Sequence, residues 1–343
     1  MHISLFIEGS GVHTSQIYTG FGLLEASGLV QLKFCKGKYY RPLRGVICAD
    51  FSGKRVVYEM GDNPEQVMHE YYETADVYFK RMATQQLIDR YPKIAPLGFN
   101  YAVYHPADHF LKRSVTVRDK MFIIKAILNN NKGLAAMAGI KTHAAGSGLQ
   151  QQEALPNPLL PPKIIFSARL WNSKTGDVVK DAERSTINQQ RINIVRKMRQ
   201  NFGDRFIGGI EDNEFSRELC PDLIISKDLF TQKINYIMHL RQCTIGIATP
   251  GLEASVGYKF AEYIAFSKAI LSTPVNVLVP GQFAAGKNYL QYTTADECVA
   301  LAHQLMNDRH ATHEMMENNF QYYQQYLRPD KLIWNSILKV CSP

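Results

Sequence analysis

The chain reads TIGIATPGLEASVGYKFAEYIAFSKAILSTPV from Thr244 to Val275. Two short apolar runs, Thr244–Ala248 and Ala269–Ser272, have the length and composition of buried strands. Small residues form a turn after the first run, and a helix is expected from about Val256 to Ser267. A strand, a turn, a helix and a second strand in this order indicate an α/β domain.

The turn leads into the N-terminus of the expected helix, where unpaired N–H groups favour a bound phosphate. Gly251 and Gly257 permit close approach of the backbone to a ligand, and Ser255 is a candidate N-cap. Lys259 and Glu262 are three residues apart and share one helix face. We expect the lysine to bind a diphosphate and the glutamate to bind ribose hydroxyls. The alternative is a surface ion pair on an ordinary helix.

A pattern in this segment resembles the donor-site signature of the GT-B glycosyltransferases, namely Gly257-x-x-x-x-Glu262-Tyr263-x-Ala265-x-x-Lys268-Ala269-Ile270. The resemblance covers residues 163–310 well and the first half of the chain only loosely. It implies that Glu262 contacts the ribose of the nucleotide. Many retaining members carry a further glutamate eight positions earlier, where this chain has Ala254, with Glu253 one residue away. An inverting reaction is therefore favoured.

A second segment of resemblance follows the expected strand Lys163–Ala168 and reads Ser167-Ala168-Arg169-Leu170-Trp171. GT-B enzymes place a basic residue at this point against the donor diphosphate, which implies that role for Arg169. A guanidinium suits it because it can hold two phosphate oxygens at once. Lys174 is a weaker candidate. The alternative is that Arg169 pairs with a local carboxylate.

Inversion needs a group that takes a proton from the acceptor hydroxyl. His13 is the leading candidate, because residues 8–13 form a glycine-rich loop after the first expected strand, where open α/β sheets bind ligands. This loop resembles the histidine-bearing loop of inverting GT-B enzymes that build cell-wall precursors. Asp62, in a loop after another strand, is the second candidate. The alternatives are a structural loop histidine and an aspartate that caps the next helix.

The sequence predicts no metal site. His105 and His109 lie close together but lack a third nearby ligand of matching geometry. The family resemblance implies the same, since GT-B enzymes generally need no bound metal. We therefore expect no cofactor, and the nucleotide sugar enters as a substrate.

The length of 343 residues exceeds what one hydrophobic core usually supports, so two domains are expected. Residues 129–162 are rich in Asn, Gly, Gln and Pro and break the α/β alternation. We expect an acceptor-binding Rossmann-like domain over 1–150, a linker over 151–162 and a nucleotide-sugar-binding Rossmann-like domain over 163–320. The resemblance implies a GT-B fold, with mainly parallel sheets facing across a cleft and C-terminal helices, 321–343, packing back on the first domain.

The formal net charge is +8, and the basic residues are spread along the chain, not concentrated in a tail. Arg191–Arg205 is basic, but its apolar spacing is that of an amphipathic helix with a solvated face, so no nucleic-acid partner is expected. The charge suits a lipid-linked acceptor and peripheral association with the inner membrane face. Six scattered cysteines and the absence of an export signal or a long apolar run favour the cytoplasm.

The resemblance implies a glycosyltransferase that moves a sugar from a nucleotide-sugar donor to a hydroxyl of a carbohydrate or lipid-linked acceptor. Synthesis of surface polysaccharide or another glycoconjugate is the expected setting. Two alternatives stay open: a nucleotide-sugar epimerase on the same fold, and a non-catalytic protein that binds sugar nucleotides.

Overall fold

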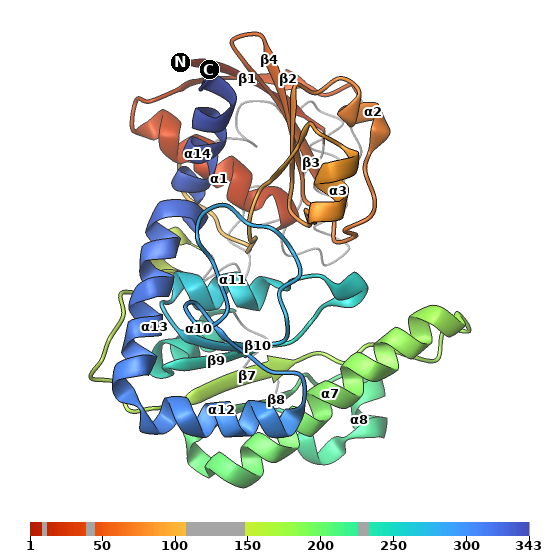
Figure 1. Cartoon of the computed structure of the whole chain (residues 1–343), viewed down its shortest axis with the longest axis vertical. Coiled ribbons are helices and arrows are strands. Elements are labelled where there is room, and N and C mark those ends of the chain that lie inside the picture. The colour runs from red at the N-terminus through yellow and green to blue at the C-terminus, as the bar shows by residue number, and fades with distance from the viewer. Residues whose placement is uncertain (9–11, 39–44, 108–147, 226–232, 343) are drawn as a thin grey trace. The chain divides into compact units, whose positions relative to one another are not determined.

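The structure is a computed structural model that describes residues 1–8, 12–38, 45–107, 148–225 and 233–342 (Figure 1). The chain divides into two compact units, Met1–Gln150 with Asn276–Gly281 and Gln324–Pro343, and Gln151–Val275 with Gln282–Tyr323. Each unit has its own sheet with flanking helices. The expected α/β fold with two mainly parallel sheets is confirmed, although one strand of the first sheet is antiparallel to its neighbours. No helix in the described ranges is long and apolar enough to cross a membrane.

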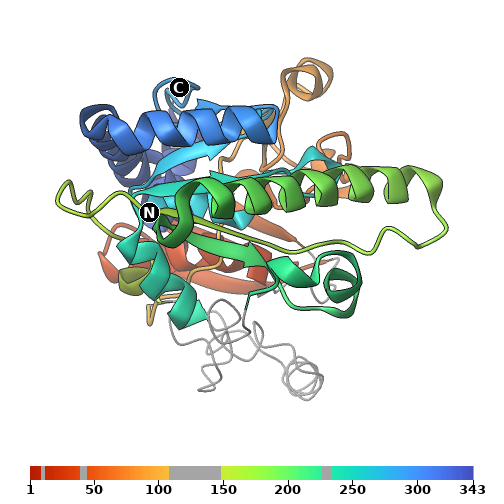
Figure 2. The same ribbon diagram turned by 90° about the horizontal axis from the view of Figure 1, so that it is seen from below.

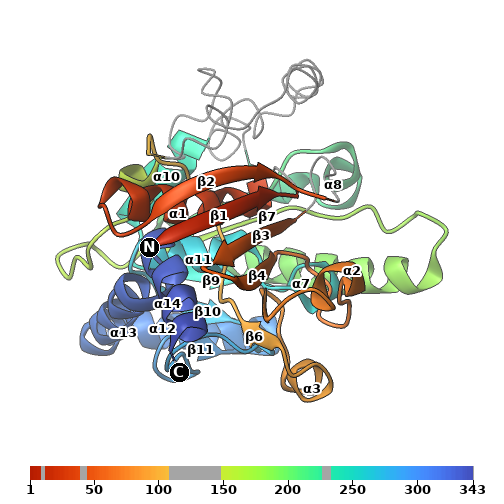
Figure 3. The same ribbon diagram turned by 90° about the horizontal axis from the view of Figure 1, so that it is seen from above.

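The first sheet has the strand order β2-β1-β3-β4-β5-β6, and the strands β2, β1, β3 and β4 can be followed in Figure 3. Its strands are β1 (His2–Ile7), β2 (Gln31–Lys36), β3 (Val46–Phe51), β4 (Lys54–Glu59), β5 (Val77–Lys80) and β6 (Ile94–Pro96). The helices of this unit are α1 (Ser15–Ala26), α2 (His69–Tyr72), α3 (Gln85–Arg90) and α14 (Pro329–Cys341). Because β3 is antiparallel to both β1 and β4, the carboxyl ends of β1, β4 and β5 lie at the same edge.

Both faces of the first sheet are buried, which explains why its central strands are apolar without alternation. In β3, Val46 and Cys48 belong to the core cluster on one face, whereas Ile47 and Ala49 belong to the cluster on the other. Successive side chains of a strand point to opposite faces, so a continuous apolar run fills two cores at once.

The C-terminal helix α14 is part of the first unit and packs against α1. Gly20 of α1 lies so close to α14 that a Cβ there would collide with the carbonyl oxygen of Pro329 and the side chain of Ile333. The Tyr58 hydroxyl of β4 is 2.5 Å from the Ser336 Oγ of α14, and both groups are buried. The close packing at Gly20 and the contact between the Tyr58 and Ser336 hydroxyls therefore fix the position of α14.

The second sheet is entirely parallel, with the strand order β11-β10-β9-β7-β8. Its strands are β7 (Ile164–Ala168), β8 (Phe206–Ile210), β9 (Ile245–Ala248), β10 (Ala269–Ser272) and β11 (Leu290–Gln291). The helices are α7 (Val178–Phe202), α8 (Glu214–Leu219), α10 (Lys233–Gln242), α11 (Tyr258–Ala265), α12 (Ala295–Asn307) and α13 (Arg309–Tyr322). The chain moves outward from β7 to β8, returns to β9 and continues in the opposite direction, so the strand order reverses between β7 and β9.

The core of the second unit lies between its sheet and the helices α7 and α12, which run side by side in Figure 2. Phe166 of β7, Val195 of α7 and Leu305 of α12 meet there. Residues 151–162, which the sequence predicts as a linker, belong to this unit. The Ala154 amide donates to the Ala265 carbonyl oxygen and the Ser267 Oγ donates to the Ala154 carbonyl oxygen, at 3.1 Å and 2.6 Å.

Candidate functional site

Two loops of the second unit start at the reversal of strand order, after β7 and after β9. These strands are parallel neighbours, with Ile164 opposite Ile245, so their carboxyl ends lie at the same edge. The loop after β7 begins with Arg169, and the turn after β9 spans residues 249–255. Open α/β sheets bind ligands outside the carboxyl ends of the strands at such a reversal. The tertiary structure therefore brings together two segments that the sequence predicted separately.

Arg191 of α7 joins these two loops. Its guanidinium donates hydrogen bonds to the Thr249 Oγ1 at 3.1 Å, the Arg169 carbonyl oxygen at 2.5 Å and the Pro250 carbonyl oxygen at 2.7 Å. The side chain is buried, and burial lowers the pKa of Arg191 to about 10, which leaves it charged at neutral pH. The sequence-based prediction of a solvated basic face is wrong at this position, because three acceptors from the loops hold the guanidinium inside.

Arg169, predicted to hold the donor diphosphate, has an exposed side chain. Its guanidinium carbon lies 5.3 Å from the centroid of the Trp171 ring, in a cation–π contact. The described contacts give it no carboxylate partner, so the alternative of a local ion pair finds no support in the described part of the chain. A stacked, exposed guanidinium remains available to an anion at the edge of the site.

The turn 249–255 contains a short 3-10 segment, Leu252–Ala254, and the backbone of this segment is strained. Glu253 and Ala254 both have positive φ, 57° and 52°, a region that costs about 1 kcal/mol or more for residues other than glycine. Hydrogen bonds close the turn: the Gly251 amide donates to the Ser255 carbonyl oxygen at 2.7 Å. A Cβ on Gly251 would collide with the Ser255 Oγ, so a larger residue there would require the serine side chain to move.

The helix after this turn begins later than expected, and its N-cap is Gly257, not Ser255. Ser255 is extended, with φ −70° and ψ 151°, and its carbonyl is used to close the preceding turn, so its hydroxyl lies too early in the chain to cap α11. No side chain caps Gly257, and a Cβ added there would meet no atom within 4 Å. The space beside Gly257, at the start of α11, therefore has room for a ligand, which suits an approaching phosphate.

Lys259, in the first turn of α11, reaches back to the end of β7. Its Nζ donates to the Ser167 Oγ at 2.7 Å and also to the Ser167 carbonyl oxygen. Burial lowers the pKa of Lys259 to about 8, and the charge of Arg191 acts in the same direction while Glu262 opposes it. An ammonium group that is poorly compensated by its surroundings gains strongly from a bound anion.

Glu262 is buried and forms an ion pair with Lys233 at the start of α10. The side chain of Glu262 is 7% exposed and that of Lys233 is 22% exposed. The alternative reading of Lys259 and Glu262 as a surface ion pair is wrong, because each side chain turns inward to a different partner. A carboxylate held in this way can accept hydrogen bonds from two vicinal hydroxyls.

Tyr236 of α10 lies beside both lysines. Its ring centroid is 5.2 Å from the Lys233 Nζ and 5.9 Å from the Lys259 Nζ, so the ring face offsets part of their charge. Burial, and next the neighbouring Tyr263 and Glu262, raise the pKa of Tyr236 well above its ordinary value. The phenol is therefore neutral at physiological pH.

The predicted bases, His13 and Asp62, both lie in the first unit near Arg81 at the carboxyl ends of β1, β4 and β5. His13 sits in a 3-10 turn, Val12–Thr14, and its carbonyl oxygen accepts from the Asn100 Nδ2 at 3.0 Å. Loss of hydration, and next the charge of Arg81, lower the pKa of His13 below its ordinary value of 6.5. The imidazole is thus neutral at pH 7 and able to accept a proton.

Asp62 forms an ion pair with Arg81, whose side chain is 3% exposed. The carboxylate is therefore engaged by a cation, which makes it the poorer candidate for the base. It does not cap a helix in the described structure, since the next helix, α2, has Met68 as its N-cap. Beside it, Glu59 and Lys80 form a second, fully buried ion pair that fixes the ends of β4 and β5.

The weaker candidates lie elsewhere. The Lys174 Nζ is 3.4 Å from Glu218, and both side chains are exposed. His105 accepts at Nδ1 from the Ala107 amide at 3.1 Å. His109, like Gly9 and Gly11 of the glycine-rich loop, lies outside the described residues.

Sequence reasoning missed Arg191, Lys233 and Tyr236. Arg191 carried one usable signal, since it lies among the apolar positions Ile187, Ile192 and Val195 of its helix and not on the opposite face. The roles of Lys233 and Tyr236 depend on α10 packing beside α11, which no local pattern reveals.

No protein-family profile matches the sequence, and no curated protein matches it. Among solved structures, an alpha-glucosyltransferase in complex with UDP-glucose and DNA containing an abasic site is 10% identical over 98% of this chain and 99% of its own, with a TM-score of 0.43. The Anabaena protein HepE, in complex with UDP and glucose, is 9% identical over 98% and 99%, with a TM-score of 0.39. A putative UDP-N-acetylglucosamine 2-epimerase from Listeria monocytogenes is 10% identical over 98% and 95%, with a TM-score of 0.38.

Glycosyltransferases and an epimerase are thus both among the solved structures similar to this chain. At about 10% identity and with TM-scores under 0.5, the similarity says nothing about which reaction this chain carries out.

Proposed function

We propose that this chain is a glycosyltransferase that moves a sugar from a nucleotide-sugar donor to an acceptor hydroxyl. The observation that supports it best is the grouping around the start of α11. Lys259, the Lys233–Glu262 pair and Arg191 gather there with the open space beside Gly257, next to the ends of β7 and β9. Cations and amides suit a diphosphate, and a held carboxylate suits a ribose.

In this proposal the leaving nucleoside diphosphate lies at the N-terminus of α11. Lys259 and the amide groups of the helix stabilise the negative charge that develops as the sugar departs. Arg191 is a positioning residue, because it fixes the loops that carry Arg169 and Gly251 and does not itself bind the diphosphate. These groups offset the diphosphate charge without a bound metal or another cofactor. Glu262 holds the ribose hydroxyls.

For the acceptor step, we assign the base to His13. A neutral imidazole can take the proton of the acceptor hydroxyl as that oxygen attacks the anomeric carbon, and the diphosphate leaves from the opposite face with inversion. Asp62 is the second candidate, and its ion pair with Arg81 makes it the poorer one.

The acceptor proposed here is a carbohydrate or a lipid-linked sugar in the synthesis of surface polysaccharide or another glycoconjugate. The net charge of +8 supports an acceptor that presents anionic groups, including one held at the inner face of a membrane. Binding to vesicles with and without anionic lipid tests this part of the proposal by itself.

The first experiment is a thermal-shift screen of the purified chain against nucleoside diphosphates and their sugars. We expect one nucleotide base to raise the melting temperature, because a ligand that binds only the folded state stabilises it. No shift with any nucleotide would contradict the proposal.

Two incubations then distinguish the three functions that the sequence left open. Incubation of the selected donor with an acceptor mixture should release nucleoside diphosphate and form a glycoside. Conversion of the donor when it is incubated alone would identify an epimerase. Binding without turnover under both conditions would identify a non-catalytic sugar-nucleotide-binding protein.

A further inference from the structure

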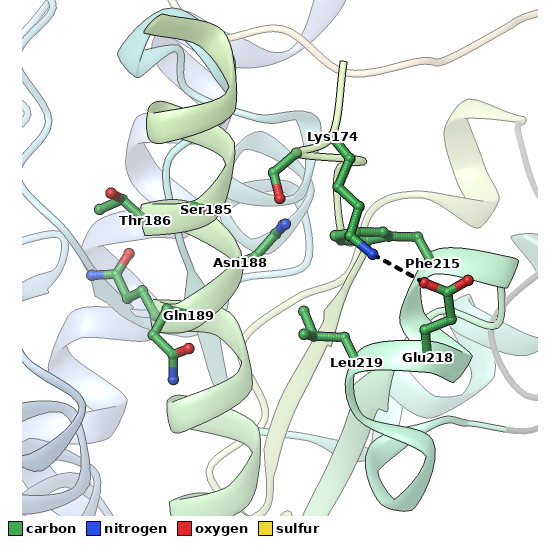
Figure 4. Close-up of a pocket in the computed structure, with 10 residues that line it drawn as sticks. Lys174, Ser185, Thr186, Asn188, Gln189, Phe215, Glu218 and Leu219 are labelled. Atoms are coloured by element: carbon green, nitrogen blue, oxygen red, sulfur yellow. Dashed lines mark hydrogen bonds and ion pairs between the residues drawn. The ribbon is translucent and has the colours of Figure 1, made fainter. Parts of the chain in front are cut away.

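A cavity of about 760 Å³ lies in the second unit, between α7, α8 and the loop after β7 (Figure 4). Its volume falls within the range of about 300–1,000 Å³ for small-molecule sites. Lys174, the weaker diphosphate candidate, lines it, whereas Arg169, Lys259 and Glu262 do not. Figure 4 shows Phe215, Glu218 and Leu219 on the α8 side and the side chains of α7 on the other. The lining groups used below are Ser173, Ser185, Thr186, Gln189, Gln190 and Phe215.

The polar part of the wall is neutral and offers hydrogen bonds in both directions. The hydroxyls of Ser173 and Ser185 can each donate and accept, whereas the Thr186 hydroxyl donates to the Ala182 carbonyl oxygen at 3.0 Å and keeps its capacity to accept. The Gln189 and Gln190 amides each donate one hydrogen bond within the protein, to the Asn193 Oδ1 at 3.0 Å and the Thr293 carbonyl oxygen at 3.4 Å, and each keeps a carbonyl oxygen and a second N–H for a ligand. A ligand rich in hydroxyl groups, each of which also donates and accepts, is complementary to such a wall.

Phe215 supplies the apolar surface. Its side chain packs against the core of the second unit, so the ring has a fixed support. The flat C–H face of a sugar ring is apolar, and an aromatic ring presents a matching surface of low conformational entropy.

The charges at this cavity cancel, which argues against an anionic ligand. The Lys174 Nζ lies 3.4 Å from the Glu218 Oε2 and 6.0 Å from the centroid of the Phe215 ring. Both charged side chains are more than half exposed, so they form a rim and are largely hydrated. A phosphate would find no unpaired cation among the lining residues.

The cavity is also preformed. Asn188 of α7, which lines it, is buried and holds the Trp171 backbone on both sides, accepting from the amide at 2.9 Å and donating to the carbonyl oxygen at 2.7 Å. This fixes the loop that carries Ser173 against the helix that carries Gln189. A ligand therefore needs little ordering of the protein when it binds.

We infer that the cavity between α7 and α8 binds a neutral carbohydrate. This inference is independent of the proposed transfer reaction, since it rests on different residues. The site would hold an oligosaccharide through its hydroxyl groups, with one sugar ring against Phe215.

The test is saturation-transfer NMR followed by calorimetric titration, with maltotriose, cellotriose and chitotriose as probes of neutral hexose and N-acetylhexosamine chains. We expect at least one trisaccharide to bind. Phe215→Ala and Gln189→Ala should each weaken its binding about tenfold, which corresponds to about 1.4 kcal/mol. Gln304→Ala is the matched control, because Gln304 is an exposed helical glutamine of the same unit outside the cavity and should leave binding unchanged.

Two results would overturn the inference: failure of all three trisaccharides to bind the wild-type chain, or equal affinity in the wild type and in Gln189→Ala. Gln189 is exposed, so its replacement preserves the fold even if Phe215→Ala does not. Nucleoside diphosphate binding is measured on the same variants. If the wild-type chain binds no nucleoside diphosphate, only the proposed function is contradicted. If it binds no trisaccharide, only the cavity assignment is contradicted.

Discussion

Lys233 of α10 and Glu262 of α11 form an ion pair that joins two helices across 29 positions of sequence. Both side chains are mostly withdrawn from water, and Tyr236 covers the lysine with its ring. The pair fixes the direction of the Glu262 carboxylate. A carboxylate held in this way in α11 is the geometric basis of the proposed ribose contact.

Replacing Lys233 with methionine should destabilise the fold, because Glu262 then stays buried without its ion-pair partner. We expect a loss of about 2 kcal/mol in the free energy of unfolding, less than for a fully buried pair because Lys233 is 22% exposed. Denaturant unfolding measures it. The control, Lys197→Met, removes an exposed pair with Asp296 and should cost less than about 1 kcal/mol. Equal losses of unfolding free energy in the two variants would show that the Lys233–Glu262 pair contributes no more to stability than an exposed ion pair.

Replacing Glu262 with glutamine should remove recognition of the ribose. The wild type is expected to bind the selected nucleoside diphosphate at least about tenfold more tightly than its 2′,3′-dideoxy analogue, because the analogue lacks the hydroxyls that would donate hydrogen bonds to the Glu262 carboxylate. In Glu262→Gln this preference should disappear. Calorimetry with both ligands measures it, and Glu314→Gln, at an exposed position of α13, is the control. A preference that persists in Glu262→Gln would place the ribose elsewhere.

Replacing Arg191 with lysine should loosen both loops, because an ammonium cannot span the three acceptors that the planar guanidinium holds. We expect nucleoside diphosphate affinity to fall about tenfold or more, together with increased hydrogen exchange in 249–255. Arg196→Lys on the same helix is the control, since the side chain of Arg196 is 45% exposed. Unchanged hydrogen exchange and unchanged nucleotide affinity in Arg191→Lys would show that Arg191 does not hold the two loops in place.

Nucleotide affinity should depend on pH through Lys259. A diphosphate binds the protonated lysine more tightly, and burial lowers the pKa of Lys259 to about 8. Affinity should therefore be full below that pH and fall as pH rises through it, by at most about tenfold per pH unit. Lys259→Arg keeps its charge and should flatten the profile. Calorimetric titration at constant ionic strength measures both, and proton uptake on binding by the wild type gives an independent check. A flat wild-type profile would contradict a role for this lysine.

Replacing His13 with glutamine should abolish transfer while leaving donor affinity unchanged, because the residue serves only the proton step. In the wild type, kcat should fall as pH drops through a pKa below 6.5, where the imidazole becomes charged. Steady-state kinetics measure the profile and calorimetry measures the donor. If His13→Gln turns over normally and Asp62→Asn does not, the base is Asp62.

The local part of the candidate site was readable from sequence. Gly257, Lys259 and Glu262 lie within one helix, where spacing alone places their side chains near one another. The strands on both sides of that helix were found for the same reason, because buried strands of an all-parallel sheet are unbroken apolar runs. The helix start was misplaced by two residues, because Ser255 closes the preceding turn and Gly257 caps the helix.

Sequence by itself determined the alternation of strands and helices, and through it an α/β fold with two sheets, because strand and helix periods depend on near neighbours. It also gave the glycines and charges of the segment 244–275. Tertiary structure decided which distant groups join them: Lys233 for Glu262, Ser167 for Lys259 and Arg191 for the two loops. Such partners are chosen by the order of strands in the sheet and the packing of helices on it, which bring together residues with no regular spacing in the chain.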